Sequence, residues 1–218
     1  MSNHTHNPIL ALKEACHDAC HERHACTHGY KELMDSKTAE EIATVLRRYW
    51  QELVSKQYAD VICEEMPYHY EELKDGFNMA GVYFNECPQS VMQQAFVLIG
   101  NSDKPVHIYG KSSAYVLGKA HVIGHDQSRL YCDQSDGKIE LLDYAKGVLT
   151  AGYAIVRNRA QLDASADCEC HNASNVLITA GTLTDHGHMQ ISAYKDAVVN
   201  SFTNRKIALY NNAKLIIR

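Results

Sequence analysis

The clearest pattern of apolar and polar positions is a period of eight residues in the last third of the chain. Four units superimpose: QISAYKDA (190–197), VVNSFTNR (198–205), KIALYNNA (206–213) and KLIIR (214–218). Their second residues are all apolar: Ile191, Val199, Ile207 and Leu215. Apolar side chains at every second position, here the second and fourth of each unit, predict a strand with one buried face. A short strand that recurs at a fixed period predicts a β-solenoid.

Each unit also has a residue suited to a corner between strands. The seventh position holds Asp196, Asn204 or Asn212, and these residue types tolerate left-handed backbone. Two strands per coil give coils of about 14–17 residues, and the small inward residues predict a narrow interior without room for a ligand. An antiparallel β-sandwich is the alternative, but the tight repeat and the missing hairpin signals favour the solenoid.

The same units continue upstream, whereas the first part of the chain has helical periodicity. KIELLDYA (138–145) matches KIALYNNA, and HVIGHDQS (121–128), QLDASADC (161–168) and NVLITAGT (175–182) fit the pattern. Further upstream, Asn7-Pro8 predicts the start of a helix over 8–28, and Thr38 with Glu41 predicts a capping box before a second helix. Pro67 is expected to end a third helix. The predicted fold class is α+β: a small N-terminal helical domain (1–90) followed by a parallel β-helix, or β-solenoid, with strand units of about eight residues (91–218).

The KIALYNNA-type units resemble those of uncharacterised short-repeat β-solenoid proteins encoded by gut Bacteroidota and their mobile elements. The resemblance covers about residues 105–218 and implies a fold, but no activity.

The composition argues against two classes of binding partner. The net charge of −5 and the pI of about 6.2 give no general attraction to nucleic acid or to an anionic membrane. The N-terminus MSNHTHNPIL has no signal-peptide pattern, and no stretch has the length of a membrane span. We therefore expect a cytoplasmic protein with no nucleic-acid or membrane partner, in which the eight cysteines are reduced thiols.

Thirteen histidines are an unusual number, and one segment concentrates them. In CHDACHERHACTH (16–28), His17, His21 and His24 fall on one face of the predicted helix, a spacing suited to zinc or another transition metal. The alternative is a solvated polar face with the cysteines packed in the core.

A second candidate metal site lies within the repeats. Cys168-x-Cys170-His171 is followed one coil later by His186-x-His188. With coils of sixteen residues, Cys170 is expected to stack near His186, which predicts a zinc site across two coils. A simple repeat of turn residues is the alternative.

The aromatic residues of the repeats predict a surface for a protein partner. Tyr194, Phe202 and Tyr210 occupy the fifth position of successive units, and tyrosine is enriched in contact surfaces. Packing between neighbouring coils is the alternative. No glycine-rich phosphate loop is present, and no nucleophile is placed for catalysis.

We therefore favour a non-catalytic protein-binding or assembly scaffold without a cofactor, in which a tyrosine-bearing face meets a protein partner. One such role is a mobile-element or phage-encoded inhibitor of a host defence process. The alternative is a metal-binding protein or metal-dependent enzyme that uses the histidine-rich helix or the Cys168-Cys170-His171/His186-His188 cluster.

The final residues predict self-association. The given sequence stops at Leu215-Ile216-Ile217-Arg218, with no later residues to cap the last coil. Open strand edges pair readily with other chains, so we expect a homodimer through the C-terminal coils.

Overall fold

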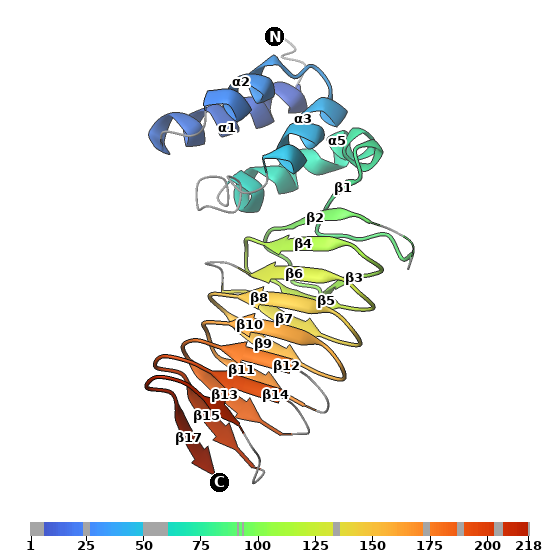
Figure 1. The fold of residues 1–218 in the computed structure, drawn as a ribbon. Helices are drawn as coiled ribbons and strands as arrows, with labels where there is room; N and C mark the ends of the chain where they lie inside the picture. Colours follow the sequence, from blue (N-terminus) through green and yellow to red (C-terminus); the bar gives the residue numbers. More distant parts are fainter. Residues whose placement is uncertain are drawn as a thin grey trace. The chain divides into compact units, whose positions relative to one another are not determined.

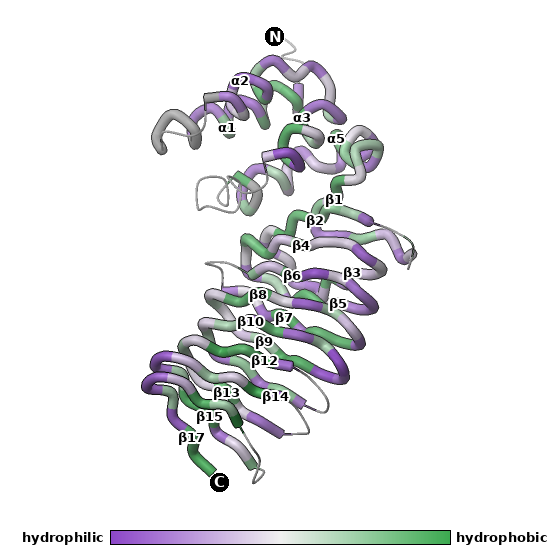
Figure 2. Tube along the Cα trace, in the orientation of Figure 1, coloured by the Kyte–Doolittle hydropathy of each residue, from purple (hydrophilic) through white to green (hydrophobic). Residues whose placement is uncertain are grey.

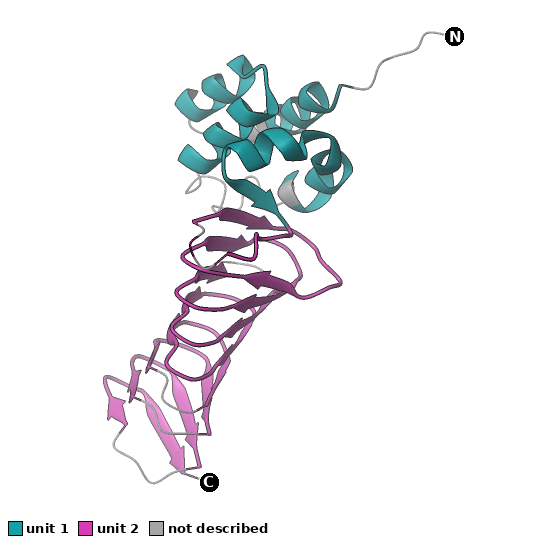
Figure 3. Ribbon diagram, turned by 90° about the vertical axis from the view of Figure 1, so that its right-hand side faces the viewer, with its two compact units in different colours: residues 1–84 teal, residues 85–218 magenta. Residues whose placement is uncertain are grey.

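The computed structural model describes residues 7–23, 27–49, 61–90, 92, 94–132, 136–171, 175–186, 190–202 and 207–217. The chain divides into two compact units, residues 1–84 and 85–218, which Figure 3 shows in different colours. We expected the boundary at residue 90. The first unit is helical and ends with strand β1 (Val82–Phe84), and the second is a β-solenoid.

The helical unit contains α1 (Pro8–Arg23), α2 (Thr27–Asp35), α3 (Ala39–Arg48), a π-helical turn η2 (Val61–Glu65) and α5 (Met66–Met79). The predicted capping box is confirmed: Glu41 N donates to Thr38 Oγ1 at 3.2 Å, and Thr38 N donates to Glu41 Oε2 at 3.2 Å. Pro67 does not end a helix. It lies in the first turn of α5, where the missing proline N–H removes no intrahelical hydrogen bond.

The core of this unit is built from apolar side chains of α1, α2, α3 and α5, and its largest fully buried members include Leu12, Ile42, Met66 and Phe77. Helices α3 and α5 approach closely at Gly76, where an added Cβ would lie 2.6 Å from Ala39 Cβ. Glycine permits this approach because it has no side chain.

The second unit is a succession of coils, each with two strands, and these strands form two parallel sheets (Figure 1). Sheet A contains β2 (Phe96–Ile99), β4 (Ser113–Val116), β6 (Arg129–Cys132), β8 (Lys146–Leu149), β10 (Gln161–Ala164), β12 (Asn175–Ile178), β14 (Gln190–Ala193) and β16 (Ala208–Leu209), in this order. Sheet B contains β3 (Val106–Ile108), β5 (His121–Gly124), β7 (Lys138–Leu141), β9 (Tyr153–Val156), β11 (Cys168–Cys170), β13 (Thr182–Asp185), β15 (Val198–Ser201) and β17 (Lys214–Ile217). The predicted parallel β-solenoid is therefore confirmed.

Alternation along each strand separates the core from the surface. In most strands the second and fourth residues are buried, and Figure 2 shows hydrophobic and hydrophilic residues alternating along the coils. Leu162 pairs with Val176, and Leu130 pairs with Gly147, so a coil contains between 14 and 17 residues. The interior is narrow: a Cβ added to Gly147 would lie 2.6 Å from Leu141 Cδ1.

Six of the described corners are four-residue turns whose second residue has left-handed backbone. Gly110, Asp126, Asp143, Asn158, Lys195 and Asn211 all have φ between 53° and 67°. In the eight-residue unit this is the sixth position. Asp196 and Asn212 lie in corners, as predicted, but the residue with left-handed backbone is the one before each of them. The strand occupies the first four positions, which places the second corner residue at position six. Asn204, which was also predicted to lie in a corner, is outside the described residues.

Candidate functional site

The predicted metal site of the N-terminal helix is described only in part. His17 is exposed on α1, and its Nδ1 lies within hydrogen-bond distance of the Tyr30 hydroxyl on α2. Of His21 only the backbone is described, and His24 lies outside the described residues. Zinc binding by these three histidines therefore stays a prediction.

The expected pairing of Cys170 with His186 is not formed. Cys170 points into the solenoid and is fully buried, as is its register partner Asp185, which accepts a hydrogen bond from Ser201 Oγ at 2.8 Å. Burial raises the pKa of the Cys170 thiol well above its ordinary value. Fifteen residues, not sixteen, separate the register partners Cys170 and Asp185, and His186 therefore follows on the outer face. Cys168 is also buried in the interior, and His188 lies outside the described residues.

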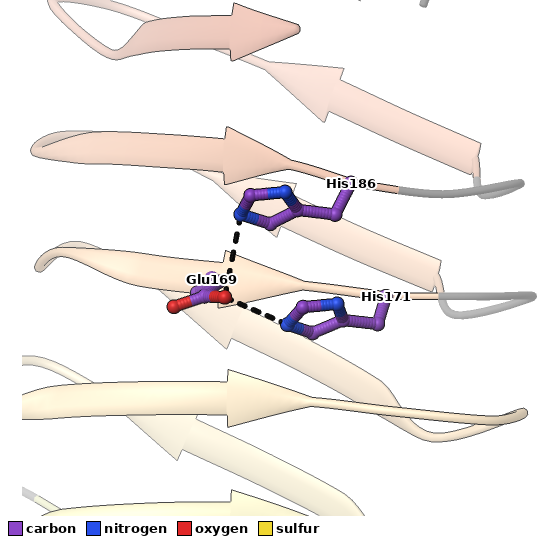
Figure 4. A group of neighbouring side chains, drawn as sticks. All are labelled: Glu169, His171 and His186. Carbon is purple, nitrogen blue, oxygen red and sulfur yellow. Dashed lines mark ion pairs between the residues drawn. The ribbon is translucent and has the colours of Figure 1, made fainter. Parts of the chain in front are cut away.

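The structure brings together a different group on the outer face of sheet B: Glu169, His171 and His186 (Figure 4). His171 Nε2 lies 2.8 Å from Glu169 Oε1, and His186 Nε2 lies 3.3 Å from the same oxygen. The two imidazole rings stack with centroids 4.8 Å apart and planes 8° apart. One carboxylate oxygen thus faces the Nε2 atoms of two histidines from neighbouring coils.

A tyrosine orients this carboxylate from the preceding coil. Tyr153 donates its hydroxyl hydrogen to Glu169 Oε2 at 2.9 Å, which leaves Oε1 directed toward the imidazoles. This hydrogen bond, more than any other interaction, holds the pKa of Glu169 below its ordinary value. Burial and the same carboxylate raise the pKa of Tyr153 to about 12. Glu169 is therefore an anion at neutral pH, and Tyr153 is its neutral donor.

Imidazoles also gather at the other end of the outer face of sheet B. His107 Nδ1 lies 2.9 Å from His125 Nε2, and Tyr109 stacks on both rings. His121 Nε2 lies 3.6 Å from Glu140, which also binds Arg157 Nε at 2.9 Å. Burial lowers the pKa of His121 and that of His125. This second histidine group has no carboxylate placed between two Nε2 atoms as Glu169 is.

Comparison with known proteins gives no relative. No protein-family model, curated protein or solved structure matches the chain. Among the described residues, no helix is both long enough and apolar enough to cross a membrane.

The three aromatic residues predicted to form one partner-binding stripe lie on two sheets. Tyr194 and Tyr210 follow strands β14 and β16 of sheet A and stack with centroids 4.4 Å apart. Phe202 follows β15 of sheet B and stacks on His186 at 5.2 Å. The reason is geometric: successive eight-residue units alternate between the two sheets, so a period of eight cannot keep a residue on one face.

Exposed apolar side chains concentrate in the last two described coils. Five of the exposed large apolar residues of the second unit lie between residues 202 and 217, namely Phe202, Leu209, Tyr210, Ile216 and Ile217. The C-terminal end of β17 is correspondingly hydrophobic in Figure 2. Leu215, the other residue predicted to form the oligomer interface, is half-buried.

Sequence patterns alone missed Glu169 and Tyr153. Alternation within the strand was the available signal, because Glu169 and His171 are two residues apart and therefore share the face opposite to Cys168 and Cys170. Tyr153 requires the register between coils, in which Glu169 pairs with Ile155.

Proposed function

We propose that the second unit is a non-catalytic assembly module and that its last coil binds a second copy of the chain. The observation that carries the proposal is the exposed apolar group Phe202, Leu209, Tyr210, Ile216 and Ile217, of which Ile217 is 58% exposed. Exposed apolar side chains near an unpaired strand edge are a common feature of protein–protein contacts.

The edge of sheet B offers backbone N–H and C=O groups that a second copy could bind. β17 is the last strand of sheet B, and Lys214 N donates to Ala197 O in the preceding coil. Because alternate residues of a strand direct their backbone groups to opposite sides, the N–H groups of Leu215 and Ile217 point to the open edge. An edge with unpaired N–H and C=O groups can accept a further strand.

A twofold axis through Ile216 pairs these N–H and C=O groups with those of the second copy. It places β17 antiparallel to β17 of the second copy, with each Leu215 opposite the other copy's Ile217. Such directly opposed residues exchange both N–H···O=C bonds. The two Ile216 side chains then meet at the axis, and the closed symmetry prevents growth into fibres.

Two finer expectations are part of the same proposal. The interior thiols Cys168 and Cys170, two residues apart, suit a reducing compartment such as the cytoplasm. Tyr194, which stacks on Tyr210 at the margin of the apolar group, extends that surface toward a different protein, such as the target of a host-process inhibitor.

Light scattering of the purified chain tests the self-association. We expect a mass of about twice 24.5 kDa. Ile216→Lys places two like charges opposite each other at the axis and should produce a monomer. Val148→Lys is the matched control, because Val148 is a similarly exposed apolar residue on sheet A, and it should leave the dimer intact. A monodisperse monomer of the intact chain would contradict the proposal.

A further inference from the structure

We propose that Glu169, His171 and His186 form a binding site for a zinc-like divalent transition metal on the outer face of sheet B. This inference is independent of the proposed dimer. It rests on the convergence of three ligand atoms, the fixed positions of the backbones that present them, and a hydrogen bond that orients the carboxylate.

The ligand atoms are already close to the separations that a metal requires. All three lie within 4.8 Å of one another, and the two nitrogen–oxygen distances are 2.8 and 3.3 Å. A tetrahedral zinc ion with metal–ligand bonds of about 2.0–2.1 Å separates its ligand atoms by about 3.4 Å. Metal binding therefore needs the two Nε2 atoms to approach each other and the parallel rings to tilt. Rotation of the side chains is sufficient for this, and the coils need not move.

The backbone holds both histidines in place. His171 N donates to Val156 O at 2.8 Å, and His186 N donates to Cys170 O at 2.9 Å, so each histidine is anchored to the coil before it. Parallel pairing of β11 with β13 fixes the offset between the two imidazoles. A site built on paired strands is more exact than one on loops alone.

Tyr153 has the role that an outer-shell residue has in known metal sites. Its hydroxyl donates to Glu169 Oε2 and leaves Oε1 for the ion. Two imidazoles and one carboxylate suit zinc, cobalt or nickel better than calcium or magnesium, which prefer all-oxygen sites. The side chains are between 22% and 36% exposed, so water can complete the coordination.

Zinc titration by calorimetry tests the site, with the full chain and zinc alone as the ligand. The titration uses a background variant with His17, His21 and His24 replaced by alanine, which removes the candidate site of the N-terminal helix. We expect about one zinc ion per chain, and a tetrahedral absorption spectrum when cobalt replaces zinc.

Two substitutions in this background assign the ligands. His186→Ala and Glu169→Gln should each weaken zinc binding at least tenfold, and His125→Ala, a matched histidine at the same position of another coil, should not. Glu169→Gln keeps the shape of the side chain, and unchanged circular dichroism and thermal unfolding show that a variant is folded. Absence of zinc binding in the background variant would overturn the proposal, as would affinity that His186→Ala and Glu169→Gln leave unchanged.

Discussion

At the scale of the residue, position within a strand decides whether a side chain stabilises the solenoid. Ile178 and Leu177 are neighbours on β12, yet Ile178 is fully buried whereas Leu177 is 37% exposed. Burying an apolar side chain of this size stabilises the fold by about 2 kcal/mol, and a polar group without a hydrogen-bond partner in the same place is costly.

Replacing these two residues tests the alternation. Ile178→Asn should lower the free energy of unfolding by about 3–4 kcal/mol, because the amide would be buried among apolar side chains. Leu177→Asn should change it by about 0.5 kcal/mol. Asparagine is used since a carboxylate at 177 would lie beside Asp163 in the neighbouring strand. Equal shifts in denaturant unfolding for the two variants would show that the assigned inner face is wrong.

At the scale of the element, we expect the capping box of α3 to make the stability of the helical unit depend on pH in acid. Lys37 N and Thr38 N both donate to Glu41 Oε2, at 2.6 and 3.2 Å, and they hold the pKa of Glu41 below its ordinary value of 4.5. A carboxyl group whose pKa is lower in the folded state contributes stability that is present above the unfolded pKa. That contribution is lost as the pH falls through the folded pKa.

Glu41→Gln should therefore flatten the pH dependence of thermal unfolding below about pH 4.5. The variant should be less stable than the natural chain at neutral pH, and the difference should shrink in acid as Glu41 becomes protonated. Glu40→Gln is the control, because Glu40 lies in the same helical turn but its side chain takes no part in the capping box. The same acid dependence in the natural chain and in Glu41→Gln would show that the box does not contribute.

The sequence predicted the local features of the strands and helices, but it did not predict the contacts between coils. Strand alternation and the capping box depend on neighbours in the chain, and for this reason the inward positions of Ile191 and Val199 and the pairing of Thr38 with Glu41 were confirmed. Contacts between coils depend on the lengths of the intervening corners. A coil one residue shorter than assumed moved His186 away from Cys170 and next to Glu169. Local patterns could not supply that length.

At the scale of the whole molecule, the solenoid is a stack in which each coil contacts only its neighbours. Interior coils have partners on both sides, whereas the last described strand of sheet B has β15 on one side. The exposed Ile216 and Ile217 lie on this strand, so apolar surface and unsatisfied backbone groups coincide there. We therefore propose that self-association occurs at this edge, away from the histidines His107 and His125 of the early coils.

Hydrogen exchange at β17, followed by NMR at several protein concentrations, tests this central claim most directly. We predict that the amide hydrogens of Leu215 and Ile217 exchange slowly in the dimer, because each donates to a carbonyl group of the second copy. They should exchange rapidly on dilution and in the Ile216→Lys variant. Rapid exchange of both amides at all concentrations, while the other β17 amides stay protected by β15, would contradict the account.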